Sequence, residues 1–117
     1  MSEGVARIDT AELAPDAFVV SATGWLGDSA ALRLRDALIP IASADGALVM
    51  LDLTSTSAIE WAPLGVIASA AHLVRRRGEN LVVVTRDPRV TARFHDCGLD
   101  ELVRIERSIA DGFAHAV

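Results

Sequence analysis

Residues 48–65 decide the fold, and they divide into three consecutive parts. These are an apolar run, Leu48-Val49-Met50-Leu51-Asp52-Leu53; a polar run, Thr54-Ser55-Thr56-Ser57; and the segment Ala58-Ile59-Glu60-Trp61-Ala62-Pro63-Leu64-Gly65. The apolar run predicts a strand over residues 47–53 in the centre of a sheet, because it is apolar on both faces. The polar run predicts a turn. A long apolar helix is expected to begin at Ala62 or Pro63, where a proline is tolerated, and to end at Gly78. Sites in open α/β sheets lie at the carboxyl ends of strands, so we expect the site around residues 59–65.

Two short strands are predicted ahead of this stretch, over residues 5–10 and 18–23. Pro15 and Asp16 lie between them in a segment with turn chemistry, so the two strands are expected to form a hairpin. Asp28 is placed to cap a helix that begins at Ser29. Pro40 is expected to end or kink this helix near residue 39.

Strands and helices alternate after the central stretch, with strands predicted over residues 81–85 and 103–106. Asp87 and Pro88 are expected to start a helix that ends at Gly98. Ser108 begins a pattern similar to a capping box, which predicts a last helix over residues 109–116. Such alternation implies parallel neighbours joined by crossovers. The fold class is therefore α/β: a mixed sheet of about five strands, with an N-terminal antiparallel hairpin and then parallel strands, packed with about four helices.

Composition limits the classes of protein to consider. The chain has 117 residues, of which 51% are hydrophobic and 23% are charged, which predicts one folded domain over residues 1–117. A net charge of −5 disfavours a nucleic-acid partner. The basic cluster at residues 75–77 complements the dipole at the end of a predicted helix. One cysteine, no signal-peptide pattern and no membrane-spanning run predict a cytoplasmic protein without direct membrane insertion.

The sequence shows no motif of a known catalytic or metal site. Gly24 and Gly27 lack the rest of either nucleotide-binding fingerprint. His72, His95 and His115 have no mutual metal-ligand spacing. Cys97 is expected to fill space in the core rather than to react, because a helix C-terminus disfavours a thiolate. We therefore expect no enzyme activity, no cofactor and no metal.

Three strings stand in a characteristic order: Val49-Met50-Leu51-Asp52-Leu53, the stretch 59–65, and Cys97-Gly98-Leu99-Asp100-Glu101-Leu102. They resemble the patterns vvlDLs, iDSSGLG and tGLdelf of the STAS domain. That family includes bacterial anti-sigma factor antagonists and the cytoplasmic tails of sulphate transporters. The resemblance covers nearly the whole chain and implies the same mixed sheet with its helices.

In family members that act as antagonists, a kinase that is itself the anti-sigma factor phosphorylates the second serine of DSSG. A phosphate is tolerated at a helix N-terminus, and its charge then alters the partner surface. In this sequence Glu60 aligns with the aspartate, Trp61 and Ala62 with the two serines, and Pro63 with the glycine. The resemblance therefore implies that phosphorylation does not occur at the aligned positions Trp61 and Ala62.

A second departure lies at the start of the first helix, where the family pattern GeLD is replaced by Gly24-Trp25-Leu26-Gly27 and the acidic residue follows as Asp28. The two departing segments are expected to lie side by side, so that Trp25 and Trp61 flank one surface. Either these tryptophans cover the end of the core, or at least one is an exposed anchor for a partner.

The hydroxyl side chains next to this surface have two interpretations. They either serve as substitute phosphorylation sites or satisfy backbone groups of the predicted turn. The residues concerned are Thr54, Thr56 and Ser57.

The resemblance implies an interaction module like an anti-sigma factor antagonist, with an ATPase-fold anti-sigma factor kinase or another signalling protein as its partner. One alternative is a scaffold or accessory subunit of a stressosome-like or lipid-transporter complex; another is a small-ligand or nucleotide sensor. Whether the chain forms a homodimer is left open. The predicted partner-binding residues are Trp25, Asp28, Glu60, Trp61, Ala62, Pro63, Leu64 and Gly65.

Overall fold

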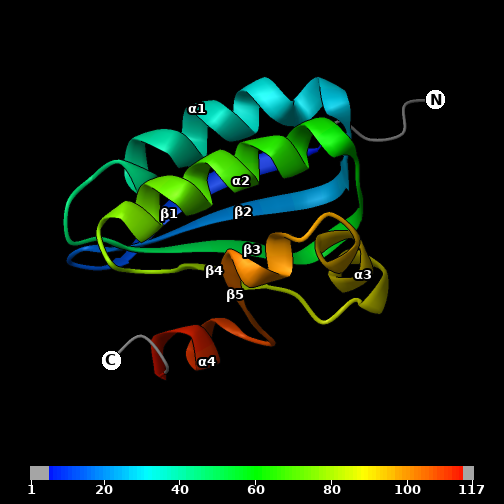
Figure 1. The fold of residues 1–117 in the computed structure, drawn as a ribbon. Coiled ribbons are helices and arrows are strands. Elements are labelled where there is room, and N and C mark those ends of the chain that lie inside the picture. The colour runs from blue at the N-terminus through cyan, green and yellow to red at the C-terminus, as the bar shows by residue number, and fades with distance from the viewer. Residues whose placement is uncertain (1–5, 115–117) are drawn as a thin grey trace.

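A five-stranded mixed sheet forms the centre of the molecule in the computed structural model, which describes residues 6–114 (Figure 1). Its strands lie in the order β1-β2-β3-β4-β5. The first pair is antiparallel and the other three pairs are parallel, as the sequence predicted. The strands are β1 (Arg7–Ala14), β2 (Ala17–Leu26), β3 (Leu48–Ile59), β4 (Leu81–Val84) and β5 (Val103–Glu106).

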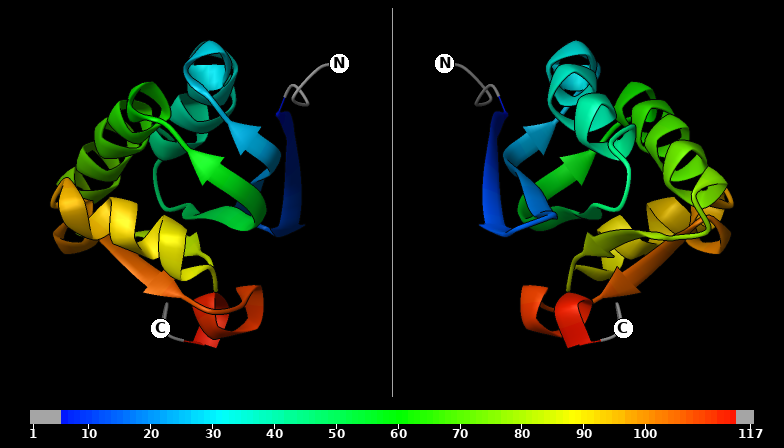
Figure 2. Two further views of the ribbon diagram at one scale, coloured as in Figure 1. Left: turned by 90° about the vertical axis from the view of Figure 1, so that its right-hand side faces the viewer. Right: turned by 90° about the vertical axis from the view of Figure 1, so that its left-hand side faces the viewer.

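Four α-helices and two short 3-10 helices connect and cover the strands. The main core lies between one face of the sheet and α1, α2 and α3, whereas α4 packs on the opposite face against a smaller cluster around Met50 (Figure 2). No helix of residues 6–114 is long and apolar enough to cross a membrane. The helices are η1 (Asp28–Ala30), α1 (Ala31–Ala42), α2 (Trp61–Arg76), α3 (Pro88–Asp96), η2 (Leu99–Glu101) and α4 (Ile109–Ala114).

The predicted turn at residues 54–57 is wrong, because β3 continues through it to Ile59. The register of β3 against β2 shifts twice, so that β3 carries extra residues there. Leu53, Thr56 and Ile59 are buried while the residues between them are exposed. Threonine is a good strand residue, and polar side chains are tolerated on the exposed face. The bulged end of β3 sets where α2 begins.

Other predicted boundaries also shift. Helix α1 does not end near residue 39 but runs past Pro40 to Ala42, because Leu38 and Ala42 are fully buried and hold the last turn in place. Pro40 itself is exposed, so its ring needs no space in the core. Both strands of the hairpin are longer than predicted. Val5 of the first predicted strand and Ala116 of the last predicted helix lie outside the described residues.

Candidate functional site

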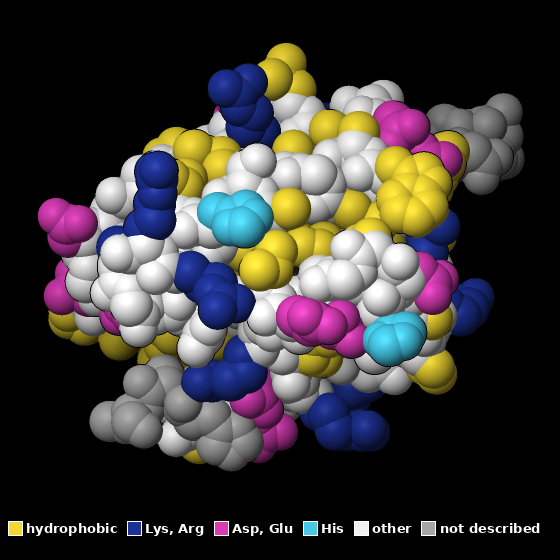
Figure 3. Space-filling model, in the orientation of Figure 1, with side chains coloured by type: hydrophobic (Ala, Val, Ile, Leu, Met, Phe, Trp, Pro, Cys, Tyr) yellow, Lys and Arg dark blue, Asp and Glu magenta, His cyan; other side chains and the backbone are white. Residues whose placement is uncertain are grey.

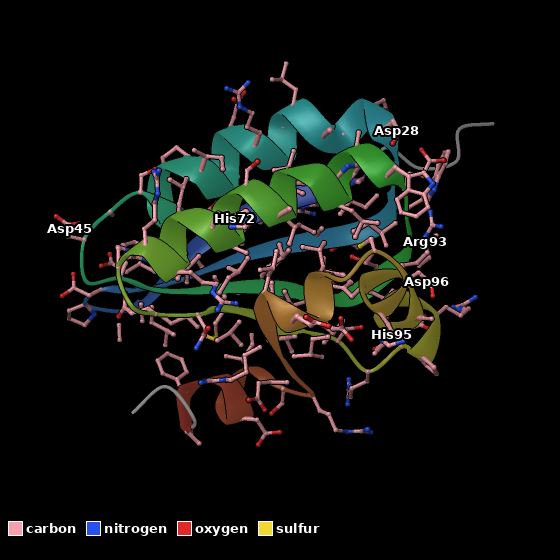
Figure 4. All side chains as sticks on the ribbon, in the orientation of Figure 1. Asp28, Asp45, His72, Arg93, His95 and Asp96 are labelled. Atoms are coloured by element: carbon pink, nitrogen blue, oxygen red, sulfur yellow. The ribbon has the colours of Figure 1, made fainter. Side chains whose placement is uncertain are left out.

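The candidate site lies at the carboxyl ends of β2 and β3, where the chain continues into η1 and α2. In Figure 4, Asp28 and Arg93 lie at this end of the molecule and Asp45 lies at the other. Glu60 donates its main-chain N–H to the carbonyl oxygen of Leu26, 3.0 Å away, which joins the two strand ends. The two segments predicted to be neighbours are therefore in direct contact.

Two acidic side chains connect these segments by exchanging hydrogen bonds. Glu60 Oε1 accepts from the main-chain N–H of Asp28 at 2.7 Å. Asp28 Oδ1 accepts from the main-chain N–H of Ala62 at 2.9 Å. Each carboxylate thus satisfies a free donor at the start of the other helix, where the helix dipole also favours negative charge. The prediction that Asp28 caps its own helix is wrong: its carboxylate caps α2, and Gly27 occupies the N-cap position of η1.

Gly27 makes this exchange sterically feasible. A Cβ atom at this position would lie 3.2 Å from Glu60 Oε1 and 3.4 Å from the Trp25 ring. Its φ of −86° is accessible to any residue, so the requirement is for space and not for backbone freedom. A side chain here would push Glu60 away from the Asp28 N–H.

Trp61, the first residue of α2, lies on the surface with 59% of its area exposed. The guanidinium of Arg93 from α3 lies over its ring, with Cζ 4.5 Å from the ring centroid. Arg93 Nε also donates to the main-chain carbonyl oxygen of Ile59 at 3.1 Å. Such cation–π contacts contribute about 0.5–1 kcal/mol at exposed sites. Arg93 therefore holds the Trp61 ring beside the end of β3 without covering it.

Trp25 is 39% exposed and lines an open groove of about 370 Å³ between the ends of β2 and β3 and helix α3. Arg89, Val90 and Arg93 form the α3 wall of this groove. Arg89 donates hydrogen bonds to the Asp87 carboxylate, which also accepts from the Arg89 main-chain N–H. These bonds lower the pKa of Asp87 and raise the pKa of Arg89. Asp87 is the N-cap of α3, as predicted. Its hydrogen bonds with Arg89 therefore fix the start of the helix that forms this wall of the groove.

The eight predicted site residues divide into surface and core residues. Leu64 is only 3% exposed, and Pro63 is also buried, so both anchor α2 in the core and offer no surface to a partner. Glu60 is half-buried by its hydrogen bond to the Asp28 segment. The exposed members are Trp25, Asp28, Trp61, Ala62 and Gly65. We call these five and Glu60 the docking face.

The hydroxyl groups of Thr54, Thr56 and Ser57 differ in their burial and in their hydrogen bonds. Thr56 is buried, and its hydroxyl donates to the carbonyl oxygen of Ala22 at 2.9 Å. This matches the prediction that it satisfies a backbone group, although in a strand and not in a turn. The Thr54 hydroxyl donates to Asp52 Oδ1 at 2.7 Å. Ser57 is exposed beside the groove.

Other residues considered at the sequence level lie away from the docking face. Cys97 is exposed, which corrects the prediction that it fills the core. His95 Nδ1 lies 2.9 Å from Asp100 Oδ2, and this hydrogen bond raises the pKa of His95. His72 is exposed on α2, and His115 lies outside the described residues. Residues 6–114 contain no group of three or more His, Cys, Asp or Glu side chains that could hold a metal ion.

Sequence reasoning missed Arg93 and Arg89, and it assigned no role to Gly27 within the departing segment. The sequence predicts a helix after Asp87, but nothing in it indicates that this helix packs beside the start of α2. The short spacing between Trp25 and Asp28 was the available signal for Gly27, since a residue between two predicted site residues must leave room for both.

Comparison with known proteins identifies the family. The model of the STAS domain matches residues 10–112. A comparison with curated protein sequences gives no match.

Solved structures share the fold at low sequence identity. An anti-sigma factor antagonist from Mycobacterium paratuberculosis has a TM-score of 0.77 and 21% identity, covering 96% of this chain and 92% of that one. The Thermotoga maritima protein tm1081, assigned as an anti-sigma factor antagonist, has a TM-score of 0.78 and 18% identity over 90% and 91% of the two chains. SpoIIAA from Bacillus in its phosphorylated form has a TM-score of 0.73 and 10% identity over 95% and 100%. At these identities the likeness establishes the fold alone.

Proposed function

This chain belongs to the STAS domain family, and we propose that it is a non-catalytic interaction module that regulates transcription by binding an anti-sigma factor or a related signalling protein. The observation that carries the proposal is the exposure of Trp61 at the first position of α2, with 59% of its area free. Tryptophan is among the residues that contribute most to protein–protein binding. A large aromatic side chain on the surface is available to a partner.

The proposed module is not switched by phosphorylation at the usual place. Trp61 and Ala62, which align with the two serines of the family pattern, carry no hydroxyl group. The Ala62 main-chain N–H already donates to Asp28 Oδ1, so a carboxyl group of the same chain caps the start of α2. The aligned positions therefore offer no hydroxyl group to a kinase, and the first turn of α2 is capped by a carboxylate of the same chain.

The composition of the docking face indicates the chemistry of its partner. Trp61 and Trp25 offer apolar area, and Asp28 and Glu60 add two carboxylates beside it. We expect a partner surface with an apolar pocket for Trp61 and a basic residue near the carboxylates. The kinase-type, ATPase-fold anti-sigma factor implied by the family resemblance is our first candidate, and we expect it to meet this module in the bacterial cytoplasm.

Calorimetric titration of this protein with ATPase-fold anti-sigma factors encoded near its gene tests the proposal. We expect binding at micromolar concentration or tighter, and a loss of affinity in Trp61→Ala. Leu32→Ala is the matched control, because Leu32 is a large side chain, 63% exposed, outside the docking face. Absence of binding to every candidate contradicts the proposal.

The scaffold alternative uses the same docking face. The kind of complex that the protein forms distinguishes it from an antagonist. Co-purification as a stable stoichiometric assembly that does not respond to ATP would favour it over an antagonist. A melting temperature that rises with a nucleotide or lipid, and with no protein partner, would instead favour the small-ligand sensor.

A further inference from the structure

A second surface lies along the seam between α1 and α2. Two hollows of about 560 and 340 Å³ share Arg35, Ile39 and Ser69 and therefore form one continuous groove, which we call the helix seam. Figure 3 shows hydrophobic side chains between the two helices, with a histidine and basic side chains around them. His72, labelled in Figure 4, projects from α2 beside this seam.

The floor of the helix seam is apolar. Ile39 from α1 and Val66 and Leu73 from α2 are partly buried and pack on the main core. The Ser69 hydroxyl donates back to the carbonyl oxygen of Gly65 at 3.2 Å, so it offers no unsatisfied donor to the seam. These side chains already contact the core, and a partner would bury their remaining exposed area.

The charge lining the helix seam is opposite to that of the whole chain. Arg35 and Arg76 line it together with His72, and no acidic side chain does. The chain as a whole has 16 acidic residues and 11 basic ones. Within residues 6–114, neither Arg35 nor Arg76 has a hydrogen-bond or ion-pair partner. By contrast, Arg77 bonds to Ala44, Ala47 and Glu79, and Arg89 pairs with Asp87. A groove with an apolar floor and free guanidinium groups at its rim complements an acidic, amphipathic partner.

The shape of the helix seam suits a helix. Small residues on α2, Ala62, Gly65 and Ser69, stand on one side of it and allow a close approach. From Ala62 to Arg76 the seam follows α2 over 15 residues, and the 14 steps between these ends rise about 21 Å along an α-helix. An amphipathic helix of about four turns covers this length.

We propose that the helix seam binds an acidic amphipathic helix of a partner protein, with its apolar stripe on Ile39 and Leu73 and its acidic side chains on Arg35 and Arg76. Nucleic acid fits this surface less well, because its phosphate backbone gains nothing from an apolar floor and because only two arginines and one histidine line the seam. The helix seam shares Ala62 and Gly65 with the docking face. Arg35 and Arg76 lie outside the docking face, so variants of these two arginines test the seam separately from the function proposed above.

A display library of helical peptides tests the proposal, with the folded full-length protein as the target. The peptides have about 16 residues, which suffices to span the seam. We expect the selected sequences to carry an i, i+3, i+4, i+7 apolar stripe flanked by Asp and Glu. Their affinity should fall by about tenfold or more in Arg35→Glu/Arg76→Glu and should weaken as salt is raised.

Arg86→Glu/Arg107→Glu is the matched control, because both residues are exposed, lie outside the seam and give the same change in net charge. It should change the affinity by less than about twofold, as is usual for distant surface charges. Circular dichroism melts of both variants verify that they fold. The proposal is overturned if no peptide is selected, if the selected peptides lack an acidic bias, or if both charge-reversed variants bind them equally.

Discussion

Asp28 and Glu60 lie on two different helix starts, and each provides the hydrogen-bond acceptor that the other segment needs: Glu60 Oε1 accepts from Asp28 N–H at 2.7 Å, and Asp28 Oδ1 accepts from Ala62 N–H at 2.9 Å. The pair therefore fastens the segment that leads into α1 to the first turn of α2. Because the docking face is built from both of these segments, its geometry depends on this exchange.

Removing either carboxylate should lower the free energy of unfolding. A side-chain cap contributes about 0.5–2 kcal/mol, so we expect a loss of about 1 kcal/mol each for Asp28→Ala and Glu60→Ala in urea denaturation. The double variant should lose less than the sum, because each bond positions the segment that makes the other. Asp36→Ala, an exposed acidic residue on α1, is the control. Strict additivity would show that the two bonds act independently.

Trp61→Ala should weaken partner binding by more than about 1 kcal/mol and leave the fold intact. The reason is that more than half of the side chain is exposed, so little core packing is lost on truncation. Calorimetry with the anti-sigma factor measures the first effect, and a thermal melt measures the second. A large fall in melting temperature with unchanged affinity would assign Trp61 a structural role instead.

Incubation with the kinase partner and ATP should add no phosphate to residues 60–65, because none of them carries a hydroxyl group. Ala62→Ser restores a hydroxyl at the position of the second serine, on an exposed residue of the first turn of α2. We expect this variant to become phosphorylated, with the site identified by mass spectrometry. Phosphate on Ser57 or Thr54 in the unaltered protein would show that another residue has taken over the switch.

The hydrogen bond between His95 and Asp100 should give a measurable pH dependence. It raises the pKa of His95 above its usual 6.5, so the pair stabilises the folded state fully below pH 6.5 and loses this effect as pH rises through the folded-state pKa. In Asp100→Asn the pKa of His95, followed by NMR titration of its ring, should fall. Asp96→Asn should lower it less, since Asp96 acts only through its charge. An unchanged pKa in Asp100→Asn would exclude the bond in solution.

Much of the fold could be predicted from local patterns. The apolar runs indicated β3 and β4, and the Asp87-Pro88 pair indicated the start of α3, because each pattern acts over a few adjacent residues. The end of β3 could not be predicted in this way. Thr54 and Thr56 have turn-like neighbours, and only their pairing with β2 across two register shifts makes this segment a strand.

The sequence predicted that the two segments of the docking face lie side by side, but it did not predict the contacts of their residues. Alignment with the family placed Trp25 and Trp61 near one another, and the structure shows both on the surface. It also shows that Arg93 contacts Trp61 and that Pro63 and Leu64 are buried. These facts depend on how α2 and α3 pack, which residues adjacent in sequence do not encode.

The sequence by itself determined the alternation of strands and helices and the absence of a hydroxyl group from residues 60–65, since these follow from residue identity and short-range periodicity. Only the tertiary structure decided that Asp28 caps α2 instead of its own helix. A free N–H at a helix start donates to whichever carboxylate the fold brings near it, and here that carboxylate comes from 34 residues away.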